Sequence, residues 1–431
     1  MKRSFIGITA LAAVGSACAQ SSITLFGVVD ASISAYSAKS TFYNSTLTPV
    51  PPPGGVTSAQ RTQTALANSG YSNSRLGFRG TEDLGGGLAA SFWLEAPLTN
   101  DNGGPNLSFT RRSTVSLSGA LGEIRLGRDF TPTFWSDTVF DPMGAVGVGT
   151  NLISSINANL AIAASGGTLN GGASGGTDNY VRTSNSIGYF LPPNLGGFYG
   201  QVQYAFHENV KTSDLEGSPS VRGRYAGGRF GYASGRLDVA LAYAQSIPAD
   251  TTTTSPAGIF VSSNERKIST ANLGVSYDLG VVKLMGELSR VADEVTNAAP
   301  VTGLGRLSLS TSDKYNGYLV GATVPVGPGL IRMAYSHVSF KDDQGPQLPP
   351  LPAGTGDASA SKFALSYVHN LSKRTALYAT AARIRIRNGQ NNPIVMGATT
   401  GGSATYVTSG TTSGLAPSSA TGFDLGIRHA F

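Results

Sequence analysis

A repeated alternation of apolar and polar residues, with a period of two, constrains the fold of this chain more than any other feature. In residues 237–243 the odd positions are large and apolar, and in residues 271–277 Leu273, Val275 and Tyr277 oppose polar or small residues. Alternation over about ten residues predicts β-strands whose two faces meet different surroundings. Past residue 20 there is no run of about 18 apolar residues, which excludes a protein that crosses a membrane with helices.

The alternating segments are sixteen in number, and short and long connections follow one another between them. The segments are 22–36, 74–83, 88–97, 108–118, 123–129, 179–190, 198–206, 222–233, 237–245, 266–278, 281–291, 312–324, 330–340, 359–370, 375–387 and 420–431. The longest connections are 37–73, 130–178, 246–265, 292–311 and 388–419. Short turns at one end and long loops at the other are typical of an antiparallel transmembrane barrel with an even strand number, whose two termini lie on the periplasmic side.

Composition separates such a barrel from a soluble β-sandwich. Charged residues make up only 13% of the chain, roughly half the share in soluble proteins. Tyr or Phe recurs at strand ends, as expected for the aromatic girdles at a membrane interface. These residues are Tyr36, Phe78, Phe92, Tyr189, Phe206, Tyr232, Tyr277, Tyr335, Tyr367 and Tyr378. Because a sheet cannot leave a free edge in lipid, it must close, and about sixteen strands enclose an aqueous lumen.

The first nineteen residues predict an export signal. A basic start (Lys2, Arg3) precedes an apolar stretch and a small-x-small site that ends at Ala19, so residues 1–19 form the signal peptide and 20–431 the barrel domain. A rival interpretation makes Cys18 the lipidated residue of a lipoprotein. Cleavage after Ala19 removes the only Cys and lowers the formal net charge from +6 to +4, which gives no indication of a nucleic-acid partner.

Four stretches resemble the trimeric general porins of Gram-negative outer membranes, in particular their β-proteobacterial branch. They are residues 23–30, 74–88, 126–128 and 422–431, and the resemblance extends over essentially the whole mature chain. It implies a homotrimer in the outer membrane, in contact with membrane lipid and lipopolysaccharide. It also implies passive diffusion of small hydrophilic or anionic solutes, without a cofactor or metal ion. The terminal Phe431 looks like the signal that the outer-membrane assembly machinery recognises by strand addition.

In this family the third loop, here residues 130–178, folds into the lumen and narrows it. By resemblance, Arg75, Arg111 and Arg182 are the basic residues of the constriction, and Asp141 is its acidic residue. Strand parity alone favours Arg112 over Arg111, and a bulge would reconcile the two assignments. Because rings of basic residues favour anions, this arrangement predicts an anion-preferring pore.

Further basic residues extend the expected positive surface along the lumen. They are Arg79, Arg128, Lys283, Lys314, Arg332, Arg383, Arg385 and Arg387. In a narrow channel with walls of low dielectric constant, such a field concentrates anions. Val28, where some relatives carry a lysine, leaves a gap in this ring.

Three other functions are open on the sequence. A barrel enzyme would have to use His337 or His369, which lie near serine and asparagine residues, but no spaced catalytic motif surrounds either one. A channel dedicated to sugars would carry a line of lumen aromatic residues, and one dedicated to phosphate-like anions a denser basic cluster. A soluble secreted β-protein or adhesin would not need the girdles or the terminal Phe431.

Overall fold

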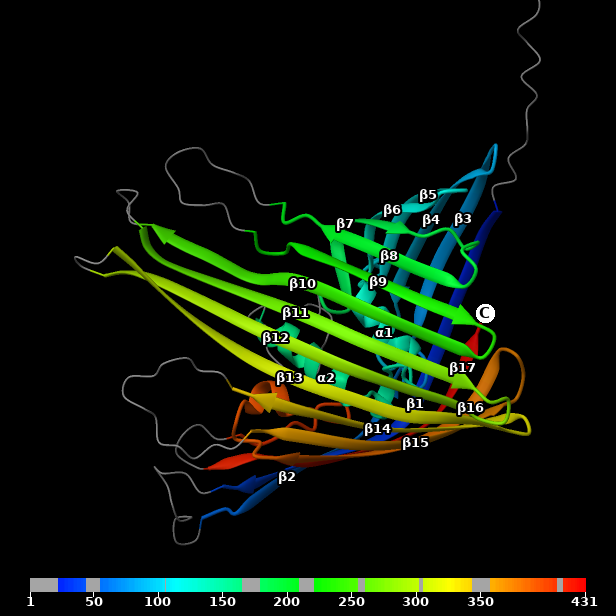
Figure 1. Ribbon diagram of the computed structural model, residues 1–431. Coiled ribbons are helices and arrows are strands. Elements are labelled where there is room, and N and C mark those ends of the chain that lie inside the picture. Colours follow the sequence, from blue (N-terminus) through cyan, green and yellow to red (C-terminus); the bar gives the residue numbers. More distant parts are fainter. Residues whose placement is uncertain are drawn as a thin grey trace, which may run out of the picture.

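The computed structural model describes residues 22–43, 55–104, 106–164, 179–208, 221–254, 260–301, 305–342, 357–408 and 414–431. The expected signal peptide and Cys18 lie outside these residues. The described chain folds into one antiparallel sheet of seventeen strands with short helices attached to it (Figure 1). The strands are β1 (Ser22–Phe42), β2 (Ser58–Asn68), β3 (Arg75–Gly85), β4 (Leu88–Pro97), β5 (Arg112–Gly119), β6 (Gly122–Phe130), β7 (Arg182–Phe190), β8 (Phe198–Ala205), β9 (Tyr225–Ser234), β10 (Leu237–Thr254), β11 (Phe260–Asp278), β12 (Lys283–Val301), β13 (Gly305–Val326), β14 (Gly329–Lys341), β15 (Ser359–Asn370), β16 (Thr375–Arg387) and β17 (Leu415–Ala430).

The sheet closes on itself, because the last strand pairs with the first. β17 runs antiparallel to β1 along most of its length, from Val28 opposite Ala430 onward. On the other side of β1, β3 pairs with its beginning and β2 with its continuation, so these two strands share one position in the ring. The ring therefore has sixteen positions, and the predicted sixteen-stranded antiparallel barrel is confirmed.

The outward face of the barrel is apolar. On β10, for example, Leu241 is 58% exposed, whereas its neighbours Ala240 and Ala242 are each 1% exposed on the inner face. This inversion of the usual pattern of soluble proteins is what a lipid-facing sheet requires.

The strands differ in length around the ring, and this corrects three predicted loops. β10 to β13 have 18 to 22 residues each, whereas β4 to β6 have 8 to 10. The predicted connections 246–265 and 292–311 are therefore largely strand, and β2 lies within the predicted loop 37–73. These segments lack apolar alternation, because a strand that extends past the lipid has polar surroundings on both faces.

The connection between β6 and β7 carries the helices α1 (Pro132–Val139) and α2 (Leu152–Ala164), with the short 3-10 helix η1 (Gly147–Gly149) between them. Thr131 caps α1 by accepting a hydrogen bond from the Phe134 amide, and Pro132 occupies the first turn. α1 contacts β8 to β11, while η1 contacts β15 to β17. Figure 1 shows α1 and α2 surrounded by strands.

Helix α2 anchors this connection to the barrel through an apolar face. Leu152, Ile153, Ile156 and Leu160 are each at most 2% exposed, and they pack in one cluster with side chains of β12 to β16. Burial of a side chain of this kind stabilises the fold by about 1.5–3 kcal/mol. Among the described helices, which also include α3 (Pro393–Met396), none is long and apolar enough to cross a membrane.

Candidate pore-lining site

Arginine side chains gather where the short strands β3 to β7 stand next to one another. Arg75 and Arg79 belong to β3, Arg111 directly precedes β5, and Arg182 begins β7. Bringing these separate positions together depends on the antiparallel register of the strands. We call the following residues the arginine arc: Arg75, Arg79, Arg111, Arg112, Arg125, Arg128 and Arg182.

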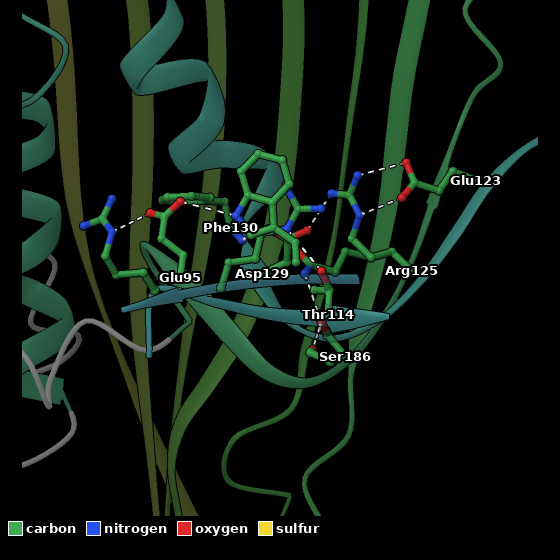
Figure 2. Close-up of polar contacts among 12 residues, drawn as sticks. Glu95, Thr114, Glu123, Arg125, Asp129, Phe130 and Ser186 are labelled. Atoms are coloured by element: carbon green, nitrogen blue, oxygen red, sulfur yellow. Dashed lines mark hydrogen bonds and ion pairs between the residues drawn. The ribbon is translucent and has the colours of Figure 1, made fainter. Parts of the chain in front are cut away.

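Glu95 on β4 holds two members of the arc. Its Oε1 atom lies 2.6 Å from Nε of Arg111 and 3.9 Å from Nε of Arg75. Arg75 is predicted to line the lumen, and its side chain is 29% exposed. The Glu95 carboxylate is one of the labelled groups with dashed contacts in Figure 2.

Arg111 and Arg112, the two candidates for one position of the site, both contact its acidic residues in the structure. Arg112 stands opposite Glu95 in the β4–β5 register, and its Nε lies 3.7 Å from Oδ1 of Asp129. Arg111 lies outside the strand, where its amide donates to the Glu95 carbonyl, so its side chain can also approach Glu95. Both arginines therefore belong to the site.

A second ion-pair group, centred on Arg125, was not predicted. Arg125 donates to both carboxylate oxygens of Glu123, at 3.1 and 2.9 Å, and its Nη1 lies 2.6 Å from Oδ2 of Asp129. Figure 2 shows these contacts side by side. The sequence signal for it was the alternation of Arg125 with Ile124 and Leu126, which places the arginine on the inner face.

Aromatic rings support the arginines of β3 and β5. The guanidinium carbon of Arg112 lies 4.5 Å from the centre of the Trp93 ring, and that of Arg79 lies 5.2 Å from it. Arg79 also lies 5.5 Å from the centre of the Phe26 ring. Stacking of this kind fixes the plane of a guanidinium without neutralising its charge.

Arg182 is held by an aromatic ring and by no ion pair in the described part of the chain. Its guanidinium lies 4.3 Å from the centre of the Phe130 ring, and its buried Nε has no hydrogen-bond partner. Within the described ranges, no carboxylate lies at ion-pair distance from Arg182. Its neighbour Arg128 sits in a bulge of β6 and donates to the Thr110 carbonyl at 2.6 Å and to Ser184 Oγ at 2.7 Å.

Asp141 does not lie on the pore side of the connection, contrary to the prediction. It is 4% exposed, and its carboxylate accepts hydrogen bonds from the amides of Met143 and Ala145 and from Nδ2 of Asn151, each at 2.9 Å. Its carboxylate is thus used to hold the turn between α1 and α2. Burial raises the pKa of Asp141 above its ordinary value.

A second acidic side chain of this connection, Asp137, is also turned into the barrel wall. It accepts hydrogen bonds from Tyr180 Oη at 2.7 Å and from Nδ2 of Asn272 on β11. Complete burial raises the pKa of Asp137 to about 6, although the hydrogen bonds of Glu287 and Tyr180 oppose the increase. Neither carboxylate therefore faces the arginine arc.

Two other predicted lumen residues point inward, with different consequences. Lys283 stands on the parity of the buried Glu287 and Ser289 of β12. Arg332 of β14 is 6% exposed and donates to the Pro142 carbonyl at 3.3 Å and to Ser366 Oγ at 3.2 Å. Arg332 thus fastens the connection to the wall and is not accessible to a passing solute.

The lumen assignment of Lys314, Arg383 and Arg385 is wrong. On β16 the arginines, Arg387 included, alternate with the buried Ile384 and Ile386, which pack in the cluster of α2. The apolar face of this strand turns inward because an apolar helix fills the barrel there, so the charged face turns outward. On β13 the buried Tyr315 and Leu319 likewise place Lys314 on the outer face.

The comparisons with known proteins agree with this architecture. A family described as Gram-negative porin matches residues 7–389. Outer membrane porin protein 32 of Delftia acidovorans is 36% identical over 434 residues, which cover 100% of both chains. An outer membrane porin protein of Bordetella pertussis is 30% identical over 405 residues, covering 88% of this chain and 93% of that protein.

A solved structure extends the match to three dimensions. The anion-selective porin from Comamonas acidovorans superposes with a TM-score of 0.66 at 33% identity, and the match covers 96% of this chain and 100% of that one. The family match, the closed sixteen-position barrel and the inward-facing arginines thus point to the same kind of protein. This chain belongs to the Gram-negative porin family and is a β-barrel of the outer membrane.

Proposed function

We propose that this porin is a passive homotrimeric diffusion channel that prefers anions. The observation that carries the proposal is the contrast between a partly exposed basic arc and loop carboxylates that are buried. In the described part of the chain, the ion pairs of the seven arc arginines involve three carboxylates, those of Glu95, Glu123 and Asp129. The local field is therefore positive, and a positive field at a constriction favours anions.

The connection between β6 and β7 supplies the narrowing in this proposal. It reaches from β8–β11 to β15–β17, and its apolar side packs on inner-face residues of the wall. In this proposal the connection forms one side of the narrowest part of the pore, and the arginine arc forms the opposite side. The porin from Comamonas acidovorans, which is described as anion-selective, supports the same preference.

Assembly and surroundings follow from the family. We propose that three copies associate in a bilayer that contains lipopolysaccharide. We also propose that the outer-membrane assembly machinery recognises the end of the chain. Phe431 exchanges backbone hydrogen bonds with Gly27 of β1, at 3.0 and 3.1 Å, and its ring is 43% exposed on the outer face. An apolar ring at the closing seam is a suitable last contact for strand addition.

No catalytic role, cofactor or nucleic-acid partner is part of the proposal. His337 shares a hydrogen bond of 2.8 Å with Ser361, and His369 shares one of 3.2 Å with Tyr367. Both histidines belong to the outer parity of their strands, where they meet aromatic neighbours such as Tyr318. These contacts are those of girdle residues.

The reversal potential of single channels in a planar bilayer under a KCl gradient tests the proposed preference. We expect a reversal potential between zero and the equilibrium potential of chloride, which corresponds to a chloride-to-potassium permeability ratio above one. A potential on the potassium side would contradict the proposal. Blue native electrophoresis of the detergent-solubilised protein tests the trimer separately.

A further inference from the structure

A recess of about 400 Å³ opens in the barrel wall beside the turn that joins β7 to β8. Its polar lining comes from Tyr199, Gln201 and Arg229, and its apolar lining includes Phe190, Leu191 and Pro192. The volume lies toward the lower end of the range of about 300–1,000 Å³ that is typical of small-molecule sites. The recess lies at the short-turn end of the barrel, and its Arg229 reaches toward Phe140 at the end of α1.

The register of three strands builds this recess. Gln201 of β8 stands directly opposite Phe190 of β7 on one side and Arg229 of β9 on the other. Directly paired side chains of an antiparallel sheet have Cβ atoms about 4.5–5.5 Å apart, so this row presents an aromatic ring, an amide and a guanidinium side by side. The next residue in the row, Ala242 of β10, is small and does not reach over the guanidinium.

Arg229 is the unusual member of the row. It is 8% exposed, and its Nε is buried without a hydrogen-bond partner. In the part of the chain that the structure describes, no carboxylate stands at ion-pair distance from it. A buried cation without a paired anion is costly, because desolvation is not offset by a direct ion pair.

The contacts of Arg229 fix its orientation but do not use all of its N–H groups. Its Nη2 donates to Tyr199 Oη at 3.1 Å, and that hydroxyl donates in turn to Oδ1 of Asp238 at 2.5 Å. The guanidinium also lies 4.9 Å from the centre of the Tyr199 ring and 5.9 Å from that of Phe140. Nε is buried, whereas Nη1 is not among the buried atoms and makes no hydrogen bond within the described ranges, so it can donate to an incoming acceptor. The side-chain amide of Gln201 likewise makes no hydrogen bond there.

We propose that the recess is a binding site for a small aromatic carboxylate. Its carboxylate would accept hydrogen bonds from Arg229 and Gln201, and its ring would rest against Phe190, Leu191 and Pro192. A charge-assisted hydrogen bond to a buried guanidinium supplies the affinity for the anion, and the apolar lining selects for the ring. The site rests on the proposed function only in that solutes reach it through the pore.

Saturation-transfer NMR and calorimetry on the detergent-solubilised, full-length protein test the site with benzoate as the probe. We expect saturable binding of benzoate, with acetate, phosphate and benzyl alcohol each binding at least tenfold more weakly. Equal binding of acetate or phosphate would overturn the aromatic class. The absence of saturable benzoate binding would overturn the site altogether.

Variants locate the binding. R229Q should weaken benzoate binding at least tenfold, and Q201L should weaken it by a smaller factor. The matched control is R236Q, which removes the same charge from the exposed β9–β10 turn at the same end of the barrel and should leave the affinity unchanged. Unchanged affinity in both R229Q and Q201L, or an equal loss in R236Q, would contradict the proposal. Q201L leaves every charge in place, so it keeps the test decisive if R229Q fails to fold.

The outcome is distinguishable from that of the proposed function. Benzoate that fails to bind a channel with anion preference would refute the recess alone. Benzoate that binds, together with a reversal potential on the potassium side, would refute the proposed anion preference alone.

Discussion

The arginine arc and the interface between the loop and the wall are both rich in charged groups, yet they use them in opposite ways. In the arc, Arg75 is 29% exposed, and Arg182 has an aromatic ring in place of an acidic partner. At the interface, Asp137, Asp141 and Asp424 are at most 4% exposed. The number of charged groups alone does not distinguish the two regions. The field in the pore depends on which groups still face water.

The interface uses its carboxylates to hold backbone in place. Asp424 of β17 accepts hydrogen bonds from Ser34 Oγ at 2.6 Å and from the Val148 amide at 3.0 Å. At the end of η1, the buried Lys362 of β15 donates to the Thr150 carbonyl at 2.5 Å. A charged group that serves as a clamp holds the connection between β6 and β7 in place, whereas we propose that the groups of the arc set the potential of the pore.

The largest expected effect lies among the clamps. Asp30 accepts hydrogen bonds from the amides of Gly70, Tyr71 and Ser72 and from the Tyr378 hydroxyl, and so secures the break between β2 and β3. D30A should lower the free energy of unfolding by about 3 kcal/mol, because buried donors lose their acceptor. The midpoint of denaturation in detergent measures this loss. D101A, at an exposed loop position, is the control, and an equal effect in both would contradict the assigned role.

A smaller effect should depend on pH through Asp137. Because burial raises its pKa from 3.8 to about 6, the folded state favours the protonated form. This contribution to stability is fully present below about pH 3.8 and is lost as the pH rises through about 6.

D137N, which resembles the protonated side chain, should therefore gain stability relative to the wild type as the pH rises from about 4 to about 8, by roughly 1–3 kcal/mol. Thermal unfolding of both proteins across this range measures the gain. A difference that stays constant with pH, or that falls as the pH rises, would show that Asp137 is not the titrating clamp.

Within the arc, removal of the Glu95 carboxylate should increase the anion preference. E95Q keeps the shape of the side chain that Arg75 and Arg111 approach but deletes its charge. The chloride-to-potassium permeability ratio should rise roughly twofold, as expected for one charge removed near a solvated pore. Reversal potentials measure the ratio, and a decrease would mean that Glu95 lies outside the field that solutes sense.

The difference between the two regions also explains what the sequence could predict. The barrel follows from alternation, because lipid imposes one polarity on the outer face of every strand that spans it. Arg75 and Arg79 follow from the same rule, since they oppose apolar neighbours on β3. Where α2 replaces water inside the barrel, the rule reverses, and Arg383 and Arg385 were assigned to the wrong face for that reason.

Side-chain partners were beyond the reach of the sequence for a related reason. The burial of Asp141 depends on Asn151 and on two amides of its own turn, which form a donor site only after the turn has folded. Arg128 lies at a bulge in β6, and a bulge shifts parity without leaving a mark in the alternation. The strand β2 was missed because both of its faces are polar.

The smallest expected effect concerns the arginines on the outer face of β16. The double variant R383Q/R385Q removes two positive charges, yet both lie outside the barrel wall. Anion preference should change by less than the effect of E95Q. A shift in reversal potential as large as that of an arc variant would return these arginines to the pore and reverse their present assignment.

The central claim is that the arc sets ion preference while the carboxylates of the loop do not. Reversal potentials of R75Q/R182Q and of D141N, measured beside the wild type under one KCl gradient, test it most directly. We predict that R75Q/R182Q loses most of its chloride preference while remaining a trimer, and that D141N keeps the wild-type value. A wild-type potential in R75Q/R182Q, or a clear increase in chloride preference in D141N, would contradict it.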